Sequence, residues 1–559
     1  MYGFTIIYNN TSQFSIEDSK SISFIGETKN AYSFFYEQSK KFGNDKLFTE
    51  TNDFIIGIDG VILNLNRLKE THNISNYTEL VLHLFKNDSQ FYNQFKGDFS
   101  GFVFNKKTEE LIAFTNHVAS KKMFYTQLEQ SSIVSHNLEY VAQFKTENQA
   151  VNSLNIDSAY ALLTYGGMLE NKTLIKDVFK LFAGEFLQIT PNSFGVNNYF
   201  DFNSVQVSIT DAKEATQKLD ALFNDLIELE YQKDIEYGYN HIATLSGGLD
   251  SRMNVMAANK MGYKTHNFCF SQSNYDDHKI AEEISKDLNN KFSFIALDNA
   301  DYLTELNENL TIYDGQIFYL ASAHYNHTLN KLDIDNYGLI HTGQIGDGVL
   351  GGFVSANKPD YSNILLSKKL TDYLPNIDVN QYSSEETFKL ANRVFNVTVA
   401  GSYVSEHHQT YLVSPFLDPE FISLCLSLHP SLKKESKIYF DWINEFRPEI
   451  ANYKWEKTGF KPDSVWKKTL SQYTKKIKKT YYSKTNQLHK TSMNPYDYWY
   501  NNNPEIVRFF ESNYDKHIGL ITDNALNKNA RLLFEEGNTI EKSLVLTLVH
   551  AINKFNLKA

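Results

Sequence analysis

The sequence predicts two domains, a layered α+β domain over residues 1–205 and an α/β domain with a doubly wound sheet over residues 206–559. Three observations lead to this prediction. Two hairpin patterns with few helices mark the first part, which is typical of a layered α+β domain. A boundary falls near residues 203–209, just before a long amphipathic helix. From Tyr239 onward strand and helix patterns alternate, as they do in a sheet covered by helices on both faces.

Composition limits the classes of function. At 559 residues the chain has room for two or three domains of ordinary size. The net charge of −12 argues against general nucleic-acid binding and against an anionic membrane surface. Only Cys269 and Cys425 are present, both among apolar neighbours, which rules out a disulfide framework. No run approaches the ~18 apolar residues of a spanning helix, and no signal peptide is visible. We therefore expect a cytoplasmic protein without nucleic-acid or membrane partners.

The first 205 residues are predicted to be rich in β-structure. Residues 54–58 and 61–63 are apolar and flank Asp59-Gly60, a pair that accepts positive φ, so we predict a short hairpin there. A helix with an apolar inward face is expected over residues 77–86. A second hairpin is expected over residues 99–114, where two apolar runs flank a polar turn.

The second part opens with a helix that Thr210 or Asp211 caps, with Glu214 in its first turn. Its apolar stripe is expected to pack in the core and consists of Leu219, Leu222, Phe223, Leu226 and Ile227. Strands are then predicted over residues 239–244, 265–270 and 337–341, and helices over residues 252–261 and 280–288. This alternation predicts a parallel sheet with a ligand at the carboxyl ends of its strands.

The stretch Leu245-Ser246-Gly247-Gly248-Leu249-Asp250-Ser251 lies between the first of these strands and its helix. Two residues without Cβ let phosphate oxygens approach the backbone, and N–H groups at the helix N-terminus point at them. Ser246 and Ser251 add hydroxyl donors. A carboxylate beside phosphates is repulsive unless a cation lies between them, so Asp250 is expected to bind Mg²⁺. The spacing of a Walker loop does not occur in the chain.

This stretch resembles the pyrophosphate loop of the ATP pyrophosphatases, and in particular that of asparagine synthetase and its relatives. The resemblance is collinear over nearly the whole chain, since residues 97–104 and 121–125 are similar to stretches of the glutamine amidotransferase domain that precedes the family's synthetase domain. It implies an Ntn amidotransferase-like sandwich followed by a PP-loop ATP pyrophosphatase domain. It also implies ATP and Mg²⁺ as cofactors.

The stretch from His341 to Gly352 is similar to the family's Ser-Gly-Glu-Gly-Ala-Asp-Glu-Leu-Phe-Gly-Gly loop. The resemblance implies that Asp347 is a second magnesium ligand and that Thr342 and Gly343 lie at the nucleotide. A solvated loop aspartate remains the alternative for Asp347. Gln344 falls where asparagine synthetases have a glutamate. Its amide can donate and accept hydrogen bonds but cannot serve as a base.

Two further segments gain a role from the resemblance. Cys269, on the second strand, is implied to line the adenine slot, although a plain core residue fits its pattern equally well. Residues 456–462 are similar to the family's Lys-x-Gly-Phe loop, which implies that Lys457 grips pyrophosphate and the acyl-adenylate transition state. The basic run Lys467 to Lys490 is expected to be solvated surface or a mobile segment, with contact to an acidic substrate as the alternative.

One departure from the family concerns glutamine. In the family the residue after the initiator Met is a cysteine whose thiolate attacks glutamine, whereas this chain begins Met1-Tyr2. A phenol of pKa about 10 does not replace a thiol nucleophile. The family's Asn-Gly-Glu stretch, which holds the glutamine, reads Asp59-Gly60-Val61 here. We therefore predict no glutamine hydrolysis and read the first domain as a structural remnant or a recognition surface.

The predicted function is ATP-dependent amide formation, in which a carboxylate is adenylated, pyrophosphate leaves and an amine displaces AMP. Both substrates are expected to be small molecules or peptides, and the sequence leaves their identity and the oligomeric state open. Two alternatives remain at this point. One is asparagine synthesis from free ammonia, and the other is a nucleotide-binding module without turnover.

Overall fold

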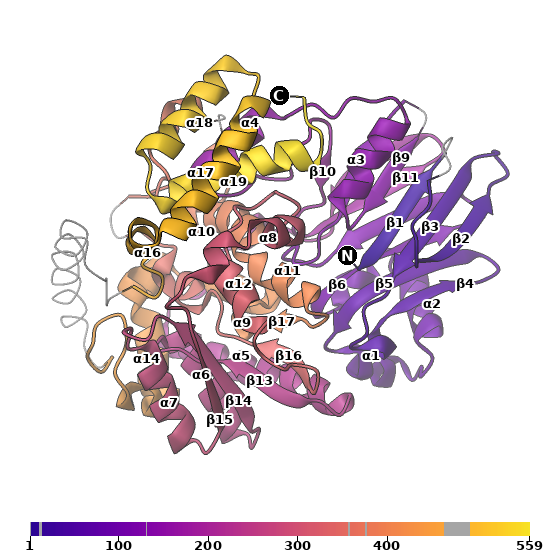
Figure 1. The fold of residues 1–559 in the computed structure, drawn as a ribbon. Coiled ribbons are helices and arrows are strands. Elements are labelled where there is room, and N and C mark those ends of the chain that lie inside the picture. Colours follow the sequence, from indigo (N-terminus) through magenta and orange to yellow (C-terminus); the bar gives the residue numbers. More distant parts are fainter. Residues whose placement is uncertain are drawn as a thin grey trace.

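The computed structural model describes residues 2–9, 14–129, 131–355, 358–374, 377–462 and 492–558. A β-rich N-terminal domain packs against a larger α/β domain, and helices from the end of the chain lie beside both (Figure 1). The basic run Lys467 to Lys490 lies outside the described residues.

The N-terminal domain is a sandwich of two six-stranded sheets, with strand orders β10-β8-β9-β1-β3-β2 and β12-β11-β7-β6-β5-β4. Aromatic and aliphatic side chains such as Phe34, Phe102 and Leu187 fill the space between the sheets. Helices cover both outer faces, so the predicted α+β sandwich is confirmed. The strands are β1 (Gly3–Tyr8), β2 (Lys20–Ile25), β3 (Ala31–Glu37), β4 (Leu47–Glu50), β5 (Phe54–Ile62), β6 (Gly97–Asn105), β7 (Glu110–Thr115), β8 (Phe124–Gln127), β9 (Ser132–Ser135), β10 (Phe179–Lys180), β11 (Glu185–Thr190) and β12 (Ser193–Asn198).

The hairpin predicted at Asp59-Gly60 is wrong. Strand β5 runs unbroken through this pair and is paired with β6 along its full length. Gly60 does have a positive φ of 122°, but a Cβ there would lie 2.1 Å from the backbone oxygen of Asp98. The glycine therefore permits close approach of two strands, not a turn. The hairpin predicted over residues 99–114 is confirmed as β6 and β7.

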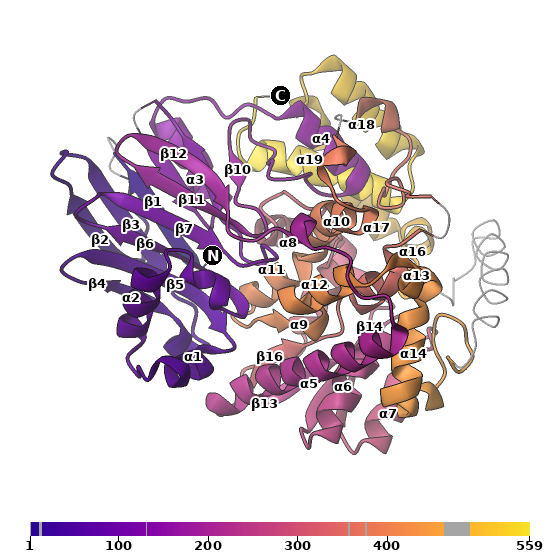
Figure 2. The ribbon, with the colours of Figure 1, turned by 180° about the vertical axis from the view of Figure 1, so that it is seen from behind.

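Of the helices described in this domain, the sequence predicted only one. The helices are α1 (Leu65–His72), α2 (Tyr77–Asn87), α3 (Leu138–Glu147) and α4 (Ile156–Tyr165). The predicted helix over residues 77–86 is α2, whose first turn is capped by the side chain of Asn76. Helix α4 lies away from the sandwich and packs against the C-terminal helices α18 (Asn524–Glu536) and α19 (Thr539–Lys554), as Figure 2 shows from behind.

The α/β domain contains a five-stranded parallel sheet in the order β15-β14-β13-β16-β17. The strand order reverses beside β13, which confirms the doubly wound sheet. The strands are β13 (Asn240–Thr244), β14 (Thr265–Ser271), β15 (Lys291–Ala296), β16 (Tyr337–His341) and β17 (Leu412–Val413). Helix α5 (Ala212–Glu236) begins as predicted, because the Asp211 side chain accepts a hydrogen bond from the N–H of Glu214.

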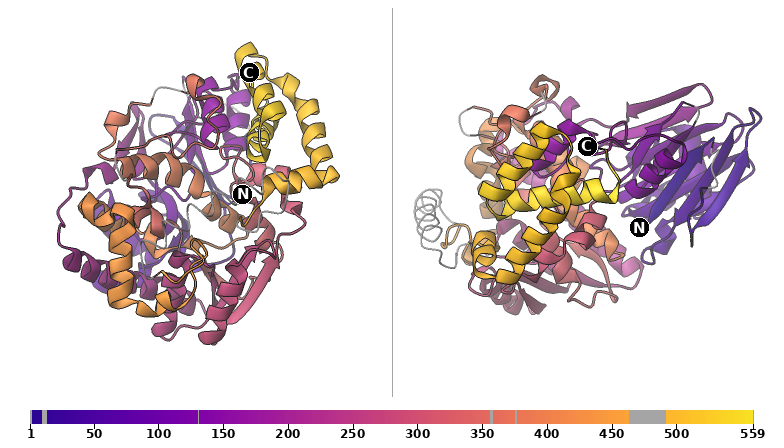
Figure 3. Two further views of the ribbon diagram at one scale, coloured as in Figure 1. Left: turned by 90° about the vertical axis from the view of Figure 1, so that its left-hand side faces the viewer. Right: turned by 45° about the horizontal axis from the view of Figure 1, so that its top comes forward.

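The remaining helices complete this domain, and those at the end of the chain gather on one side of it (Figure 3). They are α6 (Leu249–Lys260), α7 (Asp277–Asp287), α8 (Leu306–Ile312), α9 (Ala323–Leu329), α10 (Glu385–Lys389), α11 (Ala400–His407), α12 (Pro419–Ser427), α13 (Pro430–Lys433), α14 (Lys437–Phe446), α16 (Tyr496–Asn502) and α17 (Pro504–His517). Within the described residues, every helix is too short or too polar to cross a membrane.

Buried ion pairs join the two domains. Lys121 after β7 contacts Asp59 on β5 and Glu406 on α11, with Nζ–O distances of 2.7 and 2.5 Å. Lys233 on α5 contacts Asp45 of the N-terminal domain at 3.2 Å. Charges of this kind are stable only when they stay paired, so the domain interface depends on its partners remaining in register.

Candidate active site

The glycine-rich stretch lies where the sequence predicts a phosphate loop. Strand β13 ends at Thr244, and α6 begins at Leu249 with Gly248 as its N-cap. No side chain caps this helix, so its N-terminal N–H groups and its dipole are directed toward the space above the sheet. An anion is the ligand that such a helix end favours.

The backbone of the loop is partly satisfied by the protein itself. The N–H of Ser246 donates to Oγ of Ser251 at 3.0 Å, and that of Gly248 donates to Oγ of Ser246 at 3.1 Å. The N–H of Gly247 donates to Oδ1 of Asp277 at 2.8 Å. A bound phosphate would therefore meet the serine hydroxyls and the first turn of α6 before the N–H of Gly247.

Asp347 lies next to Asp250, which is in the first turn of α6. The backbone N–H of Asp347 donates to Oδ2 of Asp250 at 2.9 Å. Burial, and then the nearby charge of Asp347, raise the pKa of Asp250 to about 7. A Cβ on residue 343 would lie 2.1 Å from the backbone of Asp250. The loop that follows His341 can therefore pack this closely against α6 only because residue 343 is glycine. Two carboxylates held this close fit a hard divalent cation, which would offset their repulsion.

Lys457 lies next to this pair. Its Nζ is 3.2 Å from Oδ2 of Asp347, and both side chains are about half exposed, at 51% and 58%. Such an ion pair is screened by solvent and contributes little to stability. The lysine is therefore free to exchange its partner when another anion enters.

Arg252 holds the Lys457 loop against the phosphate loop, a role that the sequence did not indicate. Its guanidinium is fully buried and donates to the backbone oxygens of Gly247, at 2.6 Å, and of Lys454. The N–H of Glu456 donates to the same Gly247 oxygen at 3.1 Å. These bonds fix the segment that precedes Lys457 relative to α6.

One cavity of about 670 Å³ gathers most of the predicted site residues, a volume within the range of small-molecule sites. Gly247 is not among the residues on its wall, and its N–H donates to Asp277. The predicted residues that line the cavity are Leu245, Ser246, Gly248, Asp250, Ser251, Cys269, Thr342, Gly343, Gln344, Asp347 and Lys457. Unpredicted residues on the wall include Ser322, His324 and Tyr325 from the start of α9.

Cys269 and Gln344 occupy different parts of this wall. Cys269 is buried on β14, and burial raises the pKa of its thiol, so the side chain stays neutral. The amide of Gln344 is already engaged, because its Nε2 donates to the backbone oxygen of Thr398 at 2.9 Å. Its backbone oxygen accepts from Oγ of Ser414 at 3.1 Å. Gln344 is thus anchored to the wall at two points.

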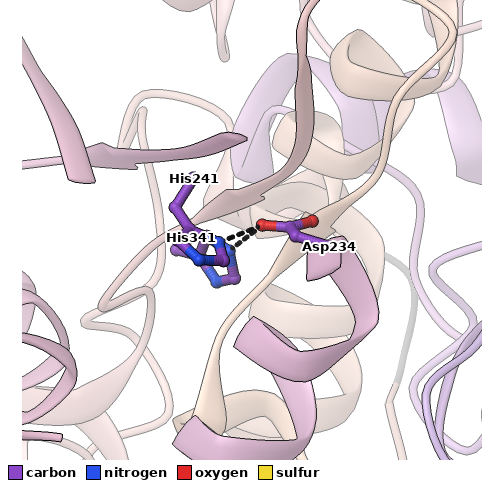
Figure 4. A group of neighbouring side chains, drawn as sticks. All are labelled: Asp234, His241 and His341. Carbon is purple, nitrogen blue, oxygen red and sulfur yellow. Dashed lines mark hydrogen bonds and ion pairs between the residues drawn. The ribbon is translucent and has the colours of Figure 1, made fainter. Parts of the chain in front are cut away.

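A second cluster of ionisable groups lies under the sheet, between α5 and the strands (Figure 4). His241 Nδ1 and His341 Nε2 lie 2.9 and 2.8 Å from Oδ2 of Asp234, and the N–H of Leu339 donates to Oδ1. Burial opposes a charge on His341, but Asp234 and Glu230 raise its pKa to about 9. These are hydrogen-bond distances, so we interpret the cluster as a buried anchor for the start of the loop that follows His341.

In the N-terminal domain a buried histidine lies beside the start of β1. His136 Nδ1 is 2.7 Å from the backbone nitrogen and 3.1 Å from the backbone oxygen of Phe4, and its Nε2 is 2.7 Å from Oγ of Ser100. Burial lowers the pKa of His136 to about 4, so the ring is neutral at neutral pH. We interpret these contacts as structural. Asp59 forms a buried ion pair with Lys121 at 2.7 Å.

Comparison with known proteins identifies both domains. The glutamine amidotransferase domain matches residues 38–200, and asparagine synthase matches residues 218–410. No curated protein gives a match.

Solved structures give only distant similarity. Glutamine phosphoribosylpyrophosphate amidotransferase from B. subtilis, complexed with ADP and GMP, shares 12% identity and covers 44% of this chain and 52% of its own, with a TM-score of 0.21. An allosteric regulatory enzyme of purine biosynthesis shares 11% identity, and the match covers 49% of this chain and 60% of that enzyme, with a TM-score of 0.22. NMN synthetase from Francisella tularensis shares 16% identity, and the match covers 43% of this chain and 97% of that enzyme, with a TM-score of 0.19. The chain thus spans about half the length of the first of these structures.

The order of the two matched domains is the one that the sequence motifs imply. With an amidotransferase domain followed by an asparagine synthase domain, the chain belongs to the asparagine synthetase-like family.

Proposed function

We propose that this protein is an ATP-dependent ligase that adenylates a carboxylate, releases pyrophosphate and forms an amide without using glutamine. The asparagine synthase domain indicates ATP-dependent amide ligation. The observation that supports the finer proposal is the pairing of Asp250 with Asp347 beside an uncapped helix N-terminus, with Lys457 at 3.2 Å from Asp347.

Each group has a distinct task in this proposal. The first turn of α6 and the hydroxyls of Ser246 and Ser251 bind phosphate oxygens. Asp250 and Asp347 would hold Mg²⁺, which neutralises phosphate charge when it is bound. Lys457 then transfers from Asp347 to the departing pyrophosphate, because its flexible stem lets a point charge follow the developing negative charge.

Gln344 bears on the nature of the amine. Its amide cannot take up a proton at neutral pH, and its Nε2 is bound to Thr398. Loss of a general base typically forfeits ~10²–10⁴ in rate, which an ammonia-dependent enzyme would have to recover elsewhere. Positioning of a larger amine can supply about 7–11 kcal/mol instead. We therefore propose that the amine belongs to an organic substrate or to the same molecule as the carboxylate.

We place the enzyme in the cytoplasm, where ATP is available and where free thiols such as those of Cys269 and Cys425 stay reduced. Its partners on this proposal are a small-molecule or peptide carboxylate and amine, and neither a nucleic acid nor a membrane. The net charge of −12 supports the last two points.

The nucleotide product tests the reaction class. A screen of carboxylates and amines with Mg·ATP should yield AMP and pyrophosphate in equal amounts. ADP as the product would contradict the proposal. Aspartate and ammonium belong in the same screen, since stoichiometric asparagine and AMP at several turnovers per second would favour simple asparagine synthesis instead.

A further inference from the structure

A tyrosine from a distant helix contacts the Asp250 carboxylate. Tyr439 lies on α14, and its hydroxyl donates to Oδ1 of Asp250 at 2.7 Å. We propose that Tyr439 is a positioning residue that holds the Asp250 carboxylate in the orientation required to bind a divalent cation. This inference rests on the proposed function, because it assumes that Asp250 is a metal ligand.

The position of the Tyr439 hydroxyl is fixed by packing. The side chain is 1% exposed, and its ring lies 6.1 Å from that of Trp442 one turn further along α14. Helix α14 in turn packs against α5, with Trp442 against Phe223. A buried ring held in this way cannot swing aside, so the hydroxyl stays at the edge of the cavity that Tyr439 lines.

The second oxygen of Asp250 accepts from a different element. The N–H of Asp347 donates to Oδ2, while Tyr439 donates to Oδ1. These donors come from two elements far apart in the chain, and together they fix the plane of the carboxylate. An ionised carboxylate has about four acceptor sites, so two remain for a metal ion.

The repulsion between Asp250 and Asp347 explains why the Asp250 carboxylate needs hydrogen bonds that fix its orientation. Without a cation the two carboxylates tend to turn away from each other, and the Tyr439 hydrogen bond opposes that rotation. Donors that orient a metal-ligating carboxylate usually matter almost as much as the ligand, and their loss lowers metal affinity or activity by about 10–100-fold.

Tyr439→Phe tests this role, because it removes the hydroxyl and keeps the ring. The affinity for Mn²⁺ is measured by electron paramagnetic resonance with an ATP analogue whose α–β bridge is a methylene group. We expect affinity to fall about 10–100-fold. Activity, where a substrate is known, should recover at high Mg²⁺, because the loss lies in the apparent KM for the metal and not in kcat.

A matched control is Tyr453→Phe, since that hydroxyl also donates to an aspartate, Asp287, at 2.9 Å, but Tyr453 is only partly buried and Asp287 is exposed. It should leave Mn²⁺ affinity unchanged. Unfolding temperature and metal-free nucleotide binding are recorded for both variants, and Tyr439→Met provides a second variant without the hydroxyl should the phenylalanine form fail to fold.

The outcomes separate the two proposals. If the natural protein binds no Mn²⁺ with the analogue, the proposed function itself is wrong. If it does bind but both Tyr439 variants match it, or if they lose metal-free nucleotide binding to the same extent, the positioning role is refuted. A selective loss of metal affinity supports it.

Discussion

Replacement of Lys121 by methionine removes the positive charge at the centre of the domain interface. Its Nζ lies 2.7 Å from Oδ2 of Asp59 and 2.5 Å from Oε1 of Glu406, and the three side chains are 0%, 0% and 9% exposed. Methionine fills the space with a flexible apolar chain but removes the nearest counter-charge of two buried carboxylates. Asp59 then keeps only the more distant charge of Lys46 and the hydrogen bond from Tyr36. Breaking a buried pair in this way costs about 3–5 kcal/mol, so we expect the free energy of unfolding to fall by that amount.

The loss of stability in Lys121→Met should depend on pH, because the charge of Asp59 does. Burial alone would raise the pKa of this carboxyl, but the charge of Lys121 holds it below its ordinary value. A depressed folded pKa gives stability that is present above the unfolded pKa of about 3.9 and is lost as the pH falls through the folded value. In the variant the buried Asp59 takes up a proton more readily, so the difference from the natural protein should shrink as the pH is lowered.

Urea unfolding curves at neutral pH and at about pH 5 measure the loss of stability and its dependence on pH. Lys218→Met is the matched control, because the Lys218–Glu214 pair joins successive turns of α5 and is half exposed, at 53% and 50%. Such a pair contributes about 0.3–0.5 kcal/mol. Equal losses for the two variants, or a loss of under about 1 kcal/mol for Lys121→Met, would refute the view that buried charges fasten the domains.

Three further predictions concern the site and its support. Asp250→Asn should lower AMP formation at least ~10²-fold, measured with a productive substrate pair; a near-normal rate would exclude Asp250 as a metal ligand. Glutamine should yield no glutamate above a buffer control, because Tyr2 replaces the nucleophile; a robust glutaminase rate would contradict this. Stability that depends on charged His341 should be present below pH ~6.5 and be lost as the pH rises through its folded pKa of about 9, on the order of 3 kcal/mol in total. The free energies of unfolding of the natural protein and of His341→Gln, measured in urea, should therefore converge at high pH. A difference that does not change with pH would contradict a role for the charge on His341.

The strand, loop and helix around residues 245–251 could be predicted because their contacts are local. Ser246 and Ser251 bond to each other over five residues, and the strand before them and the helix after them carry their own periodicity. Arg252 and Tyr439 gave no such signal. Their partners lie 202 and 189 residues away, at Lys454 and Asp250, and only the folded chain brings them together. Unless a segment resembles a known loop, a contact between residues so far apart in the chain leaves no pattern in a single sequence.

The error at Asp59-Gly60 has the same origin. The pair has a strong local preference for a turn, but the strand partner and a buried lysine decide its structure. Strand β6 pairs with β5 on both sides of Gly60, and Asp59 is needed for the contact with Lys121. Local turn propensity is weaker than a full ladder of backbone hydrogen bonds together with a buried ion pair.

The same ion pair gives the amidotransferase domain a structural connection to the synthase domain. Glu406, the second partner of Lys121, lies on α11, the helix that also places Gly401 on the wall of the cavity. Removing the N-terminal domain would leave Glu406 and its neighbours without their partners, next to that wall. The Lys121–Glu406 contact thus connects the N-terminal domain to a helix that lines the cavity, a structural role that is independent of glutamine hydrolysis.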